Sequence, residues 1–389
     1  MTAGEDLMGV ALAEAERARG RTRPNPMVGC VIVQGGRIVA QGHHRRAGGP
    51  HAERVALRRA GEAARGADVY VTLEPCNHTG RTGPCAEALV AAGVARVFIG
   101  ARDPNPLVNG RGIRHLRQAG IVVQVGLCED ACHRLNEAFE LAVVQRRVYV
   151  VAKMAQSLDG RVATRAGDSR WITGPRARAV GHRLRNELDA ILVGSGTVRA
   201  DDPRLTCRVR GGRDPIRVVL DSGATTSPSA RVVRAARESR APTWIFVGKD
   251  APARRRLALE RAGAETLTCN VRGRGLDLGQ VVRALYEREL LSVLVEGGPT
   301  VLGGFFEADL VDKVHAFVAP VLIGGEAARG SVGGRGPAGL GDATQLSACE
   351  VEAVGRDWLL TGYVTRDLRA RSAAPAPRPR RGGRHPAAR

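Results

Sequence analysis

Four residues near the start of the chain have the types and spacing of a catalytic zinc site. His51 and Glu53 form an H-x-E triplet, and Cys76, which follows Pro75, and Cys85 come later. Zinc takes nitrogen and thiolate ligands in a tetrahedron, and a catalytic site leaves one position for water. His51, Cys76 and Cys85 would supply three ligands, and Glu53 would transfer protons. This order of residues is the signature of zinc deaminases that act on nucleobases.

The two cysteines are further apart than in that general signature. Eight residues separate Cys76 from Cys85, where the signature has two. The alternative is chance, because one His, one Glu and two Cys occur in many chains. The order of the residues, Pro75 before Cys76 and the expected helix starts at His51 and Cys85 favour a zinc site.

The surrounding pattern predicts a mixed sheet flanked by helices. Helical spacing and Gly-Gly turn chemistry indicate a helix followed by a β-hairpin around Gly35 and Gly36. His51 and Glu53 would lie on the first turn of the next helix, and both cysteines near helix starts that favour thiolates. The expected helices are 7–18, 52–65 and 86–92, and the expected strands are 28–33, 37–41, 67–73, 94–100 and 121–126.

A second α/β pattern begins after a domain boundary expected between Glu140 and Val148. Its short apolar strands predict a largely parallel sheet. The expected strands are 148–152, 190–193, 216–220, 244–247, 292–295 and 314–318, and the expected helices are 176–187 and 278–289.

Glycine in this second half gathers at strand ends, in segments expected to be loops. They are 194–197, 297–300, 303–304 and 324–325. Such loops let backbone N–H groups approach phosphates. No G-x-G-x-x-G follows the first strand, and glycine-rich turns are also common without ligands. Spacing alone therefore leaves phosphate binding open.

Chain length and net charge limit the number of domains and the kinds of partner that we expect. A chain of 389 residues is long for one core and favours two or three domains. The net charge of +20 would suggest nucleic acid, but only three cations are Lys, and the Arg residues are scattered among Ala and Gly. We therefore expect no nucleic-acid partner. No apolar run is long enough to cross a bilayer and no signal peptide is visible, so we expect a cytoplasmic protein without a membrane partner.

The last segment, 366–389, differs from the rest in composition. It holds eight Arg together with Pro and Ala and shows no apolar period. We expect it to be a disordered tail, and the sequence assigns it no task.

The eight cysteines do not suggest a disulfide framework in a cytoplasmic chain. Cys128, Cys132 and His133 could share a helix face, but no fourth donor accompanies them, so a structural role is favoured over a metal site. We expect the cysteines that have no metal context to be small buried hydrophobic residues. These are Cys30, Cys207, Cys269 and Cys349.

Several longer motifs resemble those of the bifunctional riboflavin-biosynthesis deaminase-reductases, from about residue 7 to residue 364. In the first half they are 25–30, 48–53, 72–76, 80–85 and 103–106, and in the second half 153–161, 169–173, 197–206, 217–221 and 295–300. The long interval between Cys76 and Cys85 is the one that this family shows.

The resemblance implies a fold and a pair of reactions. It implies a cytidine-deaminase-like α/β/α sandwich with a mixed sheet (1–145) and a dihydrofolate-reductase-like α/β domain (146–365). The first domain would use one Zn²⁺ per chain for hydrolytic deamination of 2,5-diamino-6-(5-phosphoribosylamino)pyrimidin-4(3H)-one, through a water whose pKa the metal lowers to about 7. The second would use NADPH, without the usual fingerprint, to give 5-amino-6-(5-phosphoribitylamino)uracil. A homo-oligomer is also expected.

The resemblance also implies roles for individual residues. Glu53 would be the catalytic proton carrier, and the deaminase substrate would contact Asn25, His44, Arg81 and Asn105. The reductase substrate would contact Ser169, Arg185, Leu205, Arg208 and Glu296. NADPH would contact Ala155, Trp171, Thr197, Asp201, Ser222 and, in an expected loop, Gly298, Pro299, Thr300, Gly303 and Gly304. Lys153 begins a strand-end motif in the same cleft, with no role assigned.

Three alternatives stay open from the sequence. The chain could be a nucleic-acid or nucleoside deaminase whose second half is only a binding domain, although five matching blocks in that half argue against this. It could be an Arg-rich protein whose tail binds RNA or acidic partners. One of the two halves could also have lost its activity.

Overall fold

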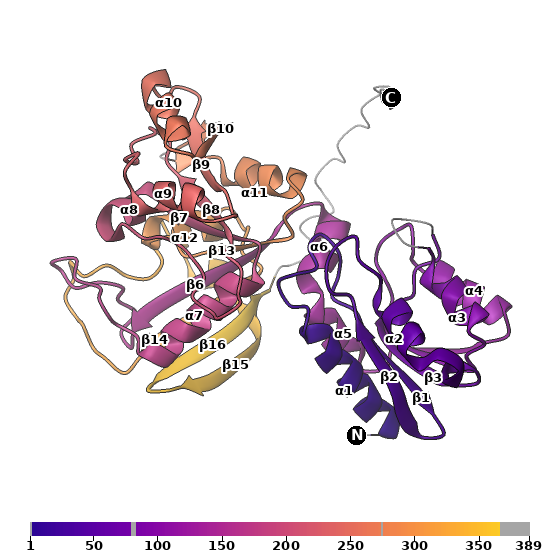
Figure 1. Cartoon of the computed structure of the whole chain (residues 1–389). Helices are drawn as coiled ribbons and strands as arrows, with labels where there is room; N and C mark the ends of the chain where they lie inside the picture. The colour runs from indigo at the N-terminus through magenta and orange to yellow at the C-terminus, as the bar shows by residue number, and fades with distance from the viewer. Residues whose placement is uncertain (1, 79–82, 274, 366–389) are drawn as a thin grey trace, which may run out of the picture.

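Two large sheets organise the chain, of which the computed structural model describes residues 2–78, 83–273 and 275–365. Figure 1 shows them as two bodies side by side, with helix α6 (Glu137–Gln145) near the junction. This helix ends shortly before strand β6 (Tyr149–Ser157) begins the second sheet. The sequence places a domain boundary in the same interval, and its position stays a prediction. No helix in the described part of the chain is long and apolar enough to cross a membrane.

The first sheet is mixed, as predicted. Its strand order is β2-β1-β3-β4-β5, in which β1 pairs antiparallel with β2 and β3, while β3, β4 and β5 are parallel. The predicted hairpin and the alternation of helices and strands after it are therefore confirmed. The strands are β1 (Gly29–Gln34), β2 (Arg37–His43), β3 (Asp68–Leu73), β4 (Arg96–Ala101) and β5 (Val122–Val125), and the helices are α1 (Ala3–Glu16), α2 (Ala52–Ala60), α3 (Cys85–Ala91), α4 (Arg111–Gln118), α5 (Glu129–Leu135) and α6.

Two glycines let helices lie directly on this sheet. A Cβ at Gly42 would be 2.6 Å from the backbone oxygen of Ala52 and 2.6 Å from the backbone nitrogen of Ala56, both on α2. A Cβ at Gly29 would similarly be 1.9 Å from the backbone oxygen of Ala11 on α1. Real Cβ atoms do not approach backbone that closely, so only glycine permits this packing. The depth at which α2 sits on the sheet, and with it the position of His51, depends on Gly42.

The second sheet is largely parallel, as predicted. Its order is β10-β9-β8-β7-β13-β6-β14-β16-β15, and only the β14–β16 and β16–β15 pairs are antiparallel. Its strands are β6, β7 (Ala190–Gly194), β8 (Ile216–Leu220), β9 (Thr243–Gly248), β10 (Glu265–Cys269), β13 (Ser292–Val295), β14 (Lys313–Ala319), β15 (Leu346–Val354) and β16 (Asp357–Val364), and a small ribbon joins β11 (Val271–Arg272) to β12 (Gly275–Leu276). The helices are α7 (Pro175–Glu187), α8 (Ser195–Asp201), α9 (Arg231–Glu238), α10 (Ala253–Arg261), α11 (Leu278–Glu287) and α12 (Pro299–Glu307).

The central strands of this sheet are buried on both faces. In β7, Leu192 belongs to one hydrophobic cluster, whereas Ile191 and Val193 belong to the cluster on the other face. Successive side chains of a strand point to opposite faces, so a strand covered on both sides must be apolar throughout. This explains the uninterrupted apolar runs in the sequence.

The structure corrects three expectations. Two of the segments expected to be loops lie in helices: residues 195–197 begin α8, and in 298–304 Gly298 caps α12 while Gly303 and Gly304 lie inside it. A Cβ at Gly303 would be 2.1 Å from the backbone oxygen of Gly333, so this glycine allows close packing. The hairpin β15–β16 was not expected, because β15 is almost entirely exposed and lacks the alternation of a half-buried strand. Among the four cysteines expected to be buried, Cys349 is exposed and Cys207 only half-buried.

Candidate active sites

The first turn of α2 carries the H-x-E triplet. His51 is the residue before the helix, with extended backbone, and Glu53 lies in the first turn. Glu53 is only 3 % exposed. A buried carboxylate is costly unless it is paired, protonated or used in chemistry. The helix therefore places an imidazole and a carboxyl group side by side at one end of the first sheet, as predicted.

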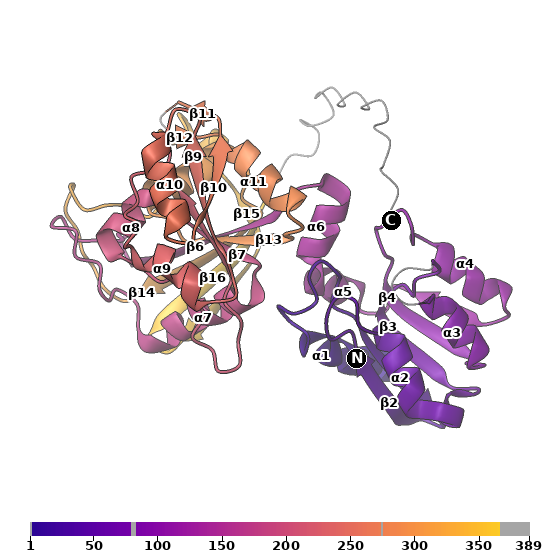
Figure 2. The same ribbon diagram turned by 45° about the horizontal axis from the view of Figure 1, so that its top comes forward.

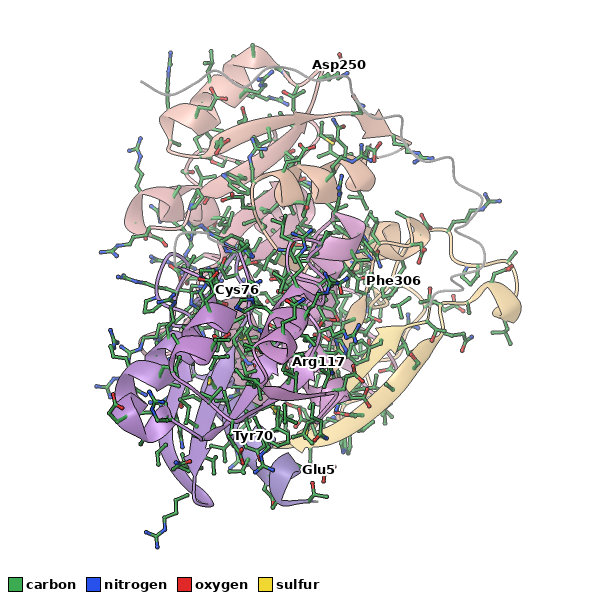
Figure 3. The ribbon with its side chains drawn as sticks, turned by 90° about the vertical axis from the view of Figure 1, so that its right-hand side faces the viewer. Glu5, Tyr70, Cys76, Arg117, Asp250 and Phe306 are labelled. Carbon is green, nitrogen blue, oxygen red and sulfur yellow. The ribbon has the colours of Figure 1, made fainter. Side chains whose placement is uncertain are left out.

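The two cysteines meet His51 at this point. The Nδ1 atom of His51 lies 3.5 Å from Sγ of Cys76 and 3.3 Å from Sγ of Cys85, and all three donor atoms lie within 4.8 Å of one another. Cys76 follows β3, and Cys85 is the first residue of α3. Figure 3 shows Cys76 and Glu5 at opposite ends of the first half. In the described part of the chain this is the one group of three or more His, Cys, Asp or Glu side chains arranged to hold a metal ion.

The charges at this cluster suit a metal cation. A hydrogen bond from the Cys85 thiol lowers the pKa of Cys76 to about 4, and the backbone N–H of Cys85 also donates to Cys76 Sγ at 3.5 Å. The same contact raises the pKa of the Cys85 thiol, which holds the shared proton. Burial raises the pKa of Glu53 to about 7. One nitrogen and two sulfurs are a zinc donor set, and a cation there would displace the shared thiol proton.

His44 and Asn25 come together beside the cluster. The Asn25 Nδ2 amide donates to His44 Nε2 at 3.0 Å, so Nδ1 of the same ring carries the hydrogen and donates to the Pro50 carbonyl at 3.1 Å. Burial lowers the pKa of His44, which is therefore neutral, and its ring lies 5.3 Å from that of His51 in an edge-on arrangement. A neutral His44 supplies no positive charge toward a substrate phosphate.

Two supporting side chains were not identified from the sequence. The Glu74 carboxylate is buried and accepts hydrogen bonds from the backbone N–H groups of Gly110, Gly112 and Ile113, which fixes the start of α4 beside Pro75 and Cys76. Arg54 donates from Nε to the Gly83 carbonyl at 3.0 Å, just before Cys85. The position of Glu74 between a buried strand and Pro75 was the only available signal.

The remaining predicted deaminase residues are placed as follows. Asn105 is half-buried in the segment that leads to Val108, and Val108 packs against Cys76 and Cys85. The side-chain oxygen of Asn105 accepts a hydrogen bond from the Leu107 backbone N–H at 3.0 Å. Arg81 lies outside the described residues, as does the tail 366–389.

The predicted reductase residues gather along one edge of the second sheet. Strands β8, β7, β13 and β6 are parallel neighbours, so their carboxyl ends meet at the same edge. Ser222, Thr197, Glu296 and Ala155 follow or end these four strands. Ligands of open α/β sheets bind outside the carboxyl ends of the strands. The predicted residues therefore occupy the edge at which a ligand is expected.

Three charged side chains meet at this edge. Arg185, on α7, donates from Nε and Nη2 to the two carboxylate oxygens of Glu296 at 2.9 and 3.0 Å. Lys153, on β6, places its Nζ 3.5 Å from Oε2 of the same carboxylate. Burial raises the pKa of Glu296, but the charges of Arg185 and Lys153 outweigh it and lower this pKa to about 2. Glu296 is therefore ionised at neutral pH, and Lys153 gains a defined partner.

Several of the predicted cofactor residues lie close to one another in space. Gly298, which caps α12, lies beside Thr197: a Cβ there would be 3.6 Å from the Thr197 hydroxyl. Trp171 is 65 % exposed, with the guanidinium of Arg178 4.6 Å above its ring. Arg170, next to it, donates to the Asp201 carbonyl at 2.8 Å. Pro299 and Thr300 open α12, whose first amides suit a phosphate.

The predicted reductase substrate residues beyond Arg185 and Glu296 lie on two loops. Ser169 is half-buried, Leu205 is buried with a positive φ of 54°, and Arg208 is exposed. The Thr206 carbonyl accepts from Nη1 of Arg185 at 3.3 Å, which connects the 205–208 loop to the Glu296 group. This contact places the loop that holds Leu205 and Arg208 beside Arg185.

Two family models match the chain. The model described as the cytidine and deoxycytidylate deaminase zinc-binding region matches residues 1–101, and the model described as the RibD C-terminal domain matches residues 148–360. The first match contains the His51, Cys76 and Cys85 cluster, and the second contains the Glu296 group. Both expected domain types are therefore present.

Curated relatives and solved structures point to the same family as the two family models. The riboflavin biosynthesis protein RibD of Actinobacillus pleuropneumoniae is 41 % identical over 93 % of this chain and 96 % of its own length, and that of Escherichia coli K12 is 43 % identical over 91 % and 97 %. The structure of Acinetobacter baumannii RibD is 36 % identical, with a TM-score of 0.82 over 94 % of this chain and 99 % of that one. A Thermotoga maritima structure, described as a diaminohydroxyphosphoribosylaminopyrimidine deaminase/5-amino-6-(5-phosphoribosylamino)uracil reductase, has the same identity and TM-score over 93 % and 99 %. The chain belongs to the RibD family of riboflavin-biosynthesis proteins and is a bifunctional enzyme, a zinc-dependent deaminase and an NADPH-dependent reductase.

Proposed function

We propose that this enzyme deaminates 2,5-diamino-6-(5-phosphoribosylamino)pyrimidin-4(3H)-one and then reduces the product to 5-amino-6-(5-phosphoribitylamino)uracil. The observation that carries the proposal is the meeting of His51, Cys76 and Cys85 beside buried Glu53, in a chain with a RibD C-terminal region. The Thermotoga maritima relative is described by the same two activities. The substrate is then a free phosphoribosyl pyrimidine and not a nucleic acid.

In the first reaction, His51, Cys76 and Cys85 hold the metal. Zinc, when bound, supplies a water activated for attack at neutral pH. Glu53 would take one proton from this water and deliver it to the pyrimidine ring nitrogen. It would then take the second proton, from the hydroxyl added to the ring carbon, and give it to the amino group, which leaves as ammonia. A pKa of about 7 lets the Glu53 carboxyl both accept and release a proton near neutral pH.

The deaminase substrate contacts Asn25, His44 and Asn105 in this proposal. Asn25 and Asn105 carry amide groups that suit the polar edge of a pyrimidine. Because His44 is neutral and bonded to Asn25, its task is to orient that amide and line the pocket. Arg81 would bind the phosphate, since its planar fork of donors fits phosphate oxygens.

In the second reaction, the Glu296 group holds the ribosyl chain. NADPH, when bound, would supply a hydride to the ribose C1; the bond from C1 to the ring oxygen breaks, and that oxygen takes a proton from solvent. The ionised Glu296 carboxylate accepts hydrogen bonds from sugar hydroxyls, and Lys153 and Arg185 keep it ionised. Ser169, Leu205 and Arg208 complete the substrate contacts, with Arg208 directed to the phosphate.

NADPH lies along the carboxyl edge of the second sheet. Gly298, Pro299 and Thr300 offer it the start of α12, with Thr197 alongside. The other proposed contacts are Ala155, Trp171, Asp201 and Ser222. Gly303 and Gly304 remain predicted contacts through the same helix.

We further propose domains at 1–145 and 146–365, a tail at 366–389, a cytoplasmic location and a homo-oligomeric state. The exposed edge strand β15 supports the last of these, because an unpaired strand edge can pair with another copy. Val351 on this strand is 64 % exposed. Light scattering on the wild type and on Val351→Lys tests it: a lower mass for the variant is expected, and a monomeric wild type would refute it.

A two-step product assay tests the proposed function. The enzyme, the diaminopyrimidine phosphoribosyl compound and NADPH should yield one ammonia and one oxidised NADPH for each ribityl product. Ammonia release without NADPH oxidation would support the proposed deaminase reaction and refute the proposed reductase reaction.

A further inference from the structure

Asn136 holds the loop that carries Asn25. It lies between α5 and α6 and is 3 % exposed. Its Oδ1 accepts from the Met27 backbone N–H at 2.8 Å, and its Nδ2 donates to the Met27 carbonyl at 2.9 Å. The oxygen and the nitrogen of the buried Asn136 amide thus both bond to Met27, which lies two positions from Asn25. The same loop directs the Asn25 amide to His44.

The residue after Asn136 is tied to the second sheet. The Glu137 Oε1 atom accepts from Nζ of Lys313, the first residue of β14, at 2.9 Å. The two side chains are only 24 % and 16 % exposed, so this pair is less screened than a surface ion pair. Lys313 is also fixed by the ring of Tyr363, 4.7 Å from its Nζ.

The residues before Asn25 also contact the second half. A Cβ at Gly20 would be 2.3 Å from the backbone oxygen of Asn186, and Arg21 donates to the Gly211 carbonyl at 3.4 Å. A cavity of about 160 Å³ lies between the halves and is lined by Asn25, Asn136 and Glu137 from one and by Lys313 from the other. Figures 1 and 2 both place α6, which begins at Glu137, between the two sheets.

We infer that the reductase half completes the deaminase site: Asn136 is a positioning residue for Asn25, and the Lys313–Glu137 ion pair holds Asn136 in place. This inference rests on the proposed contact of Asn25 with the deaminase substrate. We assign neither Lys313 nor Glu137 a contact with that substrate. Their effect reaches it through the peptide bond between Glu137 and Asn136, the two Asn136–Met27 hydrogen bonds and the loop.

The test is the substitution Lys313→Met in the full zinc-loaded chain, with ammonia release measured without NADPH. We expect the deaminase KM to rise about three- to tenfold while kcat stays within about twofold, the range for loss of a coupling contact. The zinc ligands and Glu53 are not moved, which is why kcat is spared. Lys313→Arg keeps the charge and should restore a KM near that of the wild type.

Two further variants control the result. Arg288→Met removes an ion pair with Glu265 inside the second half and should leave the deaminase KM unchanged. Glu137→Gln, which removes the partner charge while keeping its shape, should raise KM as Lys313→Met does. Zinc content and NADPH oxidation with the deaminated substrate report whether each variant is folded.

An unchanged deaminase KM in both Lys313→Met and Glu137→Gln overturns the inference. Equal losses of kcat, zinc and reductase activity in both variants overturn it as well, because they would show a general structural role. Absence of ammonia release in the wild type would instead refute the proposed function.

Discussion

The guanidinium of Arg185 forms two parallel hydrogen bonds with the carboxylate of Glu296, at 2.9 and 3.0 Å. The residues are 111 positions apart in sequence and meet where β13 ends beside α7. Lysine offers a single point charge and not a fork. We therefore expect Arg185→Lys to lower kcat/KM of the reductase about 10- to 100-fold, through loss of one bond to a charged partner, which is worth about 1.5–3 kcal/mol. Steady-state NADPH oxidation measures this, with ammonia release as the unaffected control.

The same pair predicts a dependence of stability on pH. The pKa of Glu296 is lowered from 4.5 to about 2 in the folded enzyme, so the unfolded chain binds a proton more readily. The stabilisation is present in full above about pH 4.5 and is lost as the pH falls toward about 2. Urea unfolding of the wild type and of Glu296→Gln at several pH values should give curves that converge on acidification. Parallel curves would contradict the assignment.

Removal of zinc should separate the two activities. Cys76→Ser and Cys85→Ser each take a thiolate from the only metal-binding group that the described residues contain. We expect metal analysis to give about one zinc per wild-type chain and much less in either variant. Ammonia release should disappear, whereas NADPH oxidation with the deaminated substrate should continue. Full zinc content in both variants would rule out this site.

Packing at Gly42 should affect both the stability of the deaminase half and its affinity for zinc. Gly42→Ala places a methyl group against the backbone of α2, which must move and cannot simply rotate a side chain. We expect a loss of about 1–3 kcal/mol in unfolding free energy, together with weaker zinc binding, because α2 carries His51. Gly9→Ala is the matched control: nothing lies within 4 Å of its Cβ on α1, so a stabilisation of up to about 1 kcal/mol is expected. Urea unfolding and metal titration distinguish the two variants.

The sequence predicted the zinc cluster because His51, Glu53, Cys76 and Cys85 each stand at an element boundary that local pattern identifies. It could not predict Arg54 or Asn136 as supports, since their partners lie 29 and 109 positions away and are polar backbone groups. It also missed α12, because the glycines at 297–298 and 303–304 disfavour a helix. That helix forms because Gly303 allows close packing against Gly333, which is a tertiary effect. The neutral state of His44 is likewise a tertiary effect, because burial of the ring lowers its pKa.

The deaminase and reductase reactions take place in succession at two separate sites of one chain. Glu53→Gln keeps the size of the side chain but cannot carry the proton, and it leaves the second sheet untouched. Ammonia release from the diaminopyrimidine phosphoribosyl compound and NADPH oxidation with its deaminated product should be measured on the same preparation. We expect the first rate to fall about 10²- to 10⁴-fold and the second to be unchanged. Loss of both activities in a folded, zinc-containing variant would contradict it.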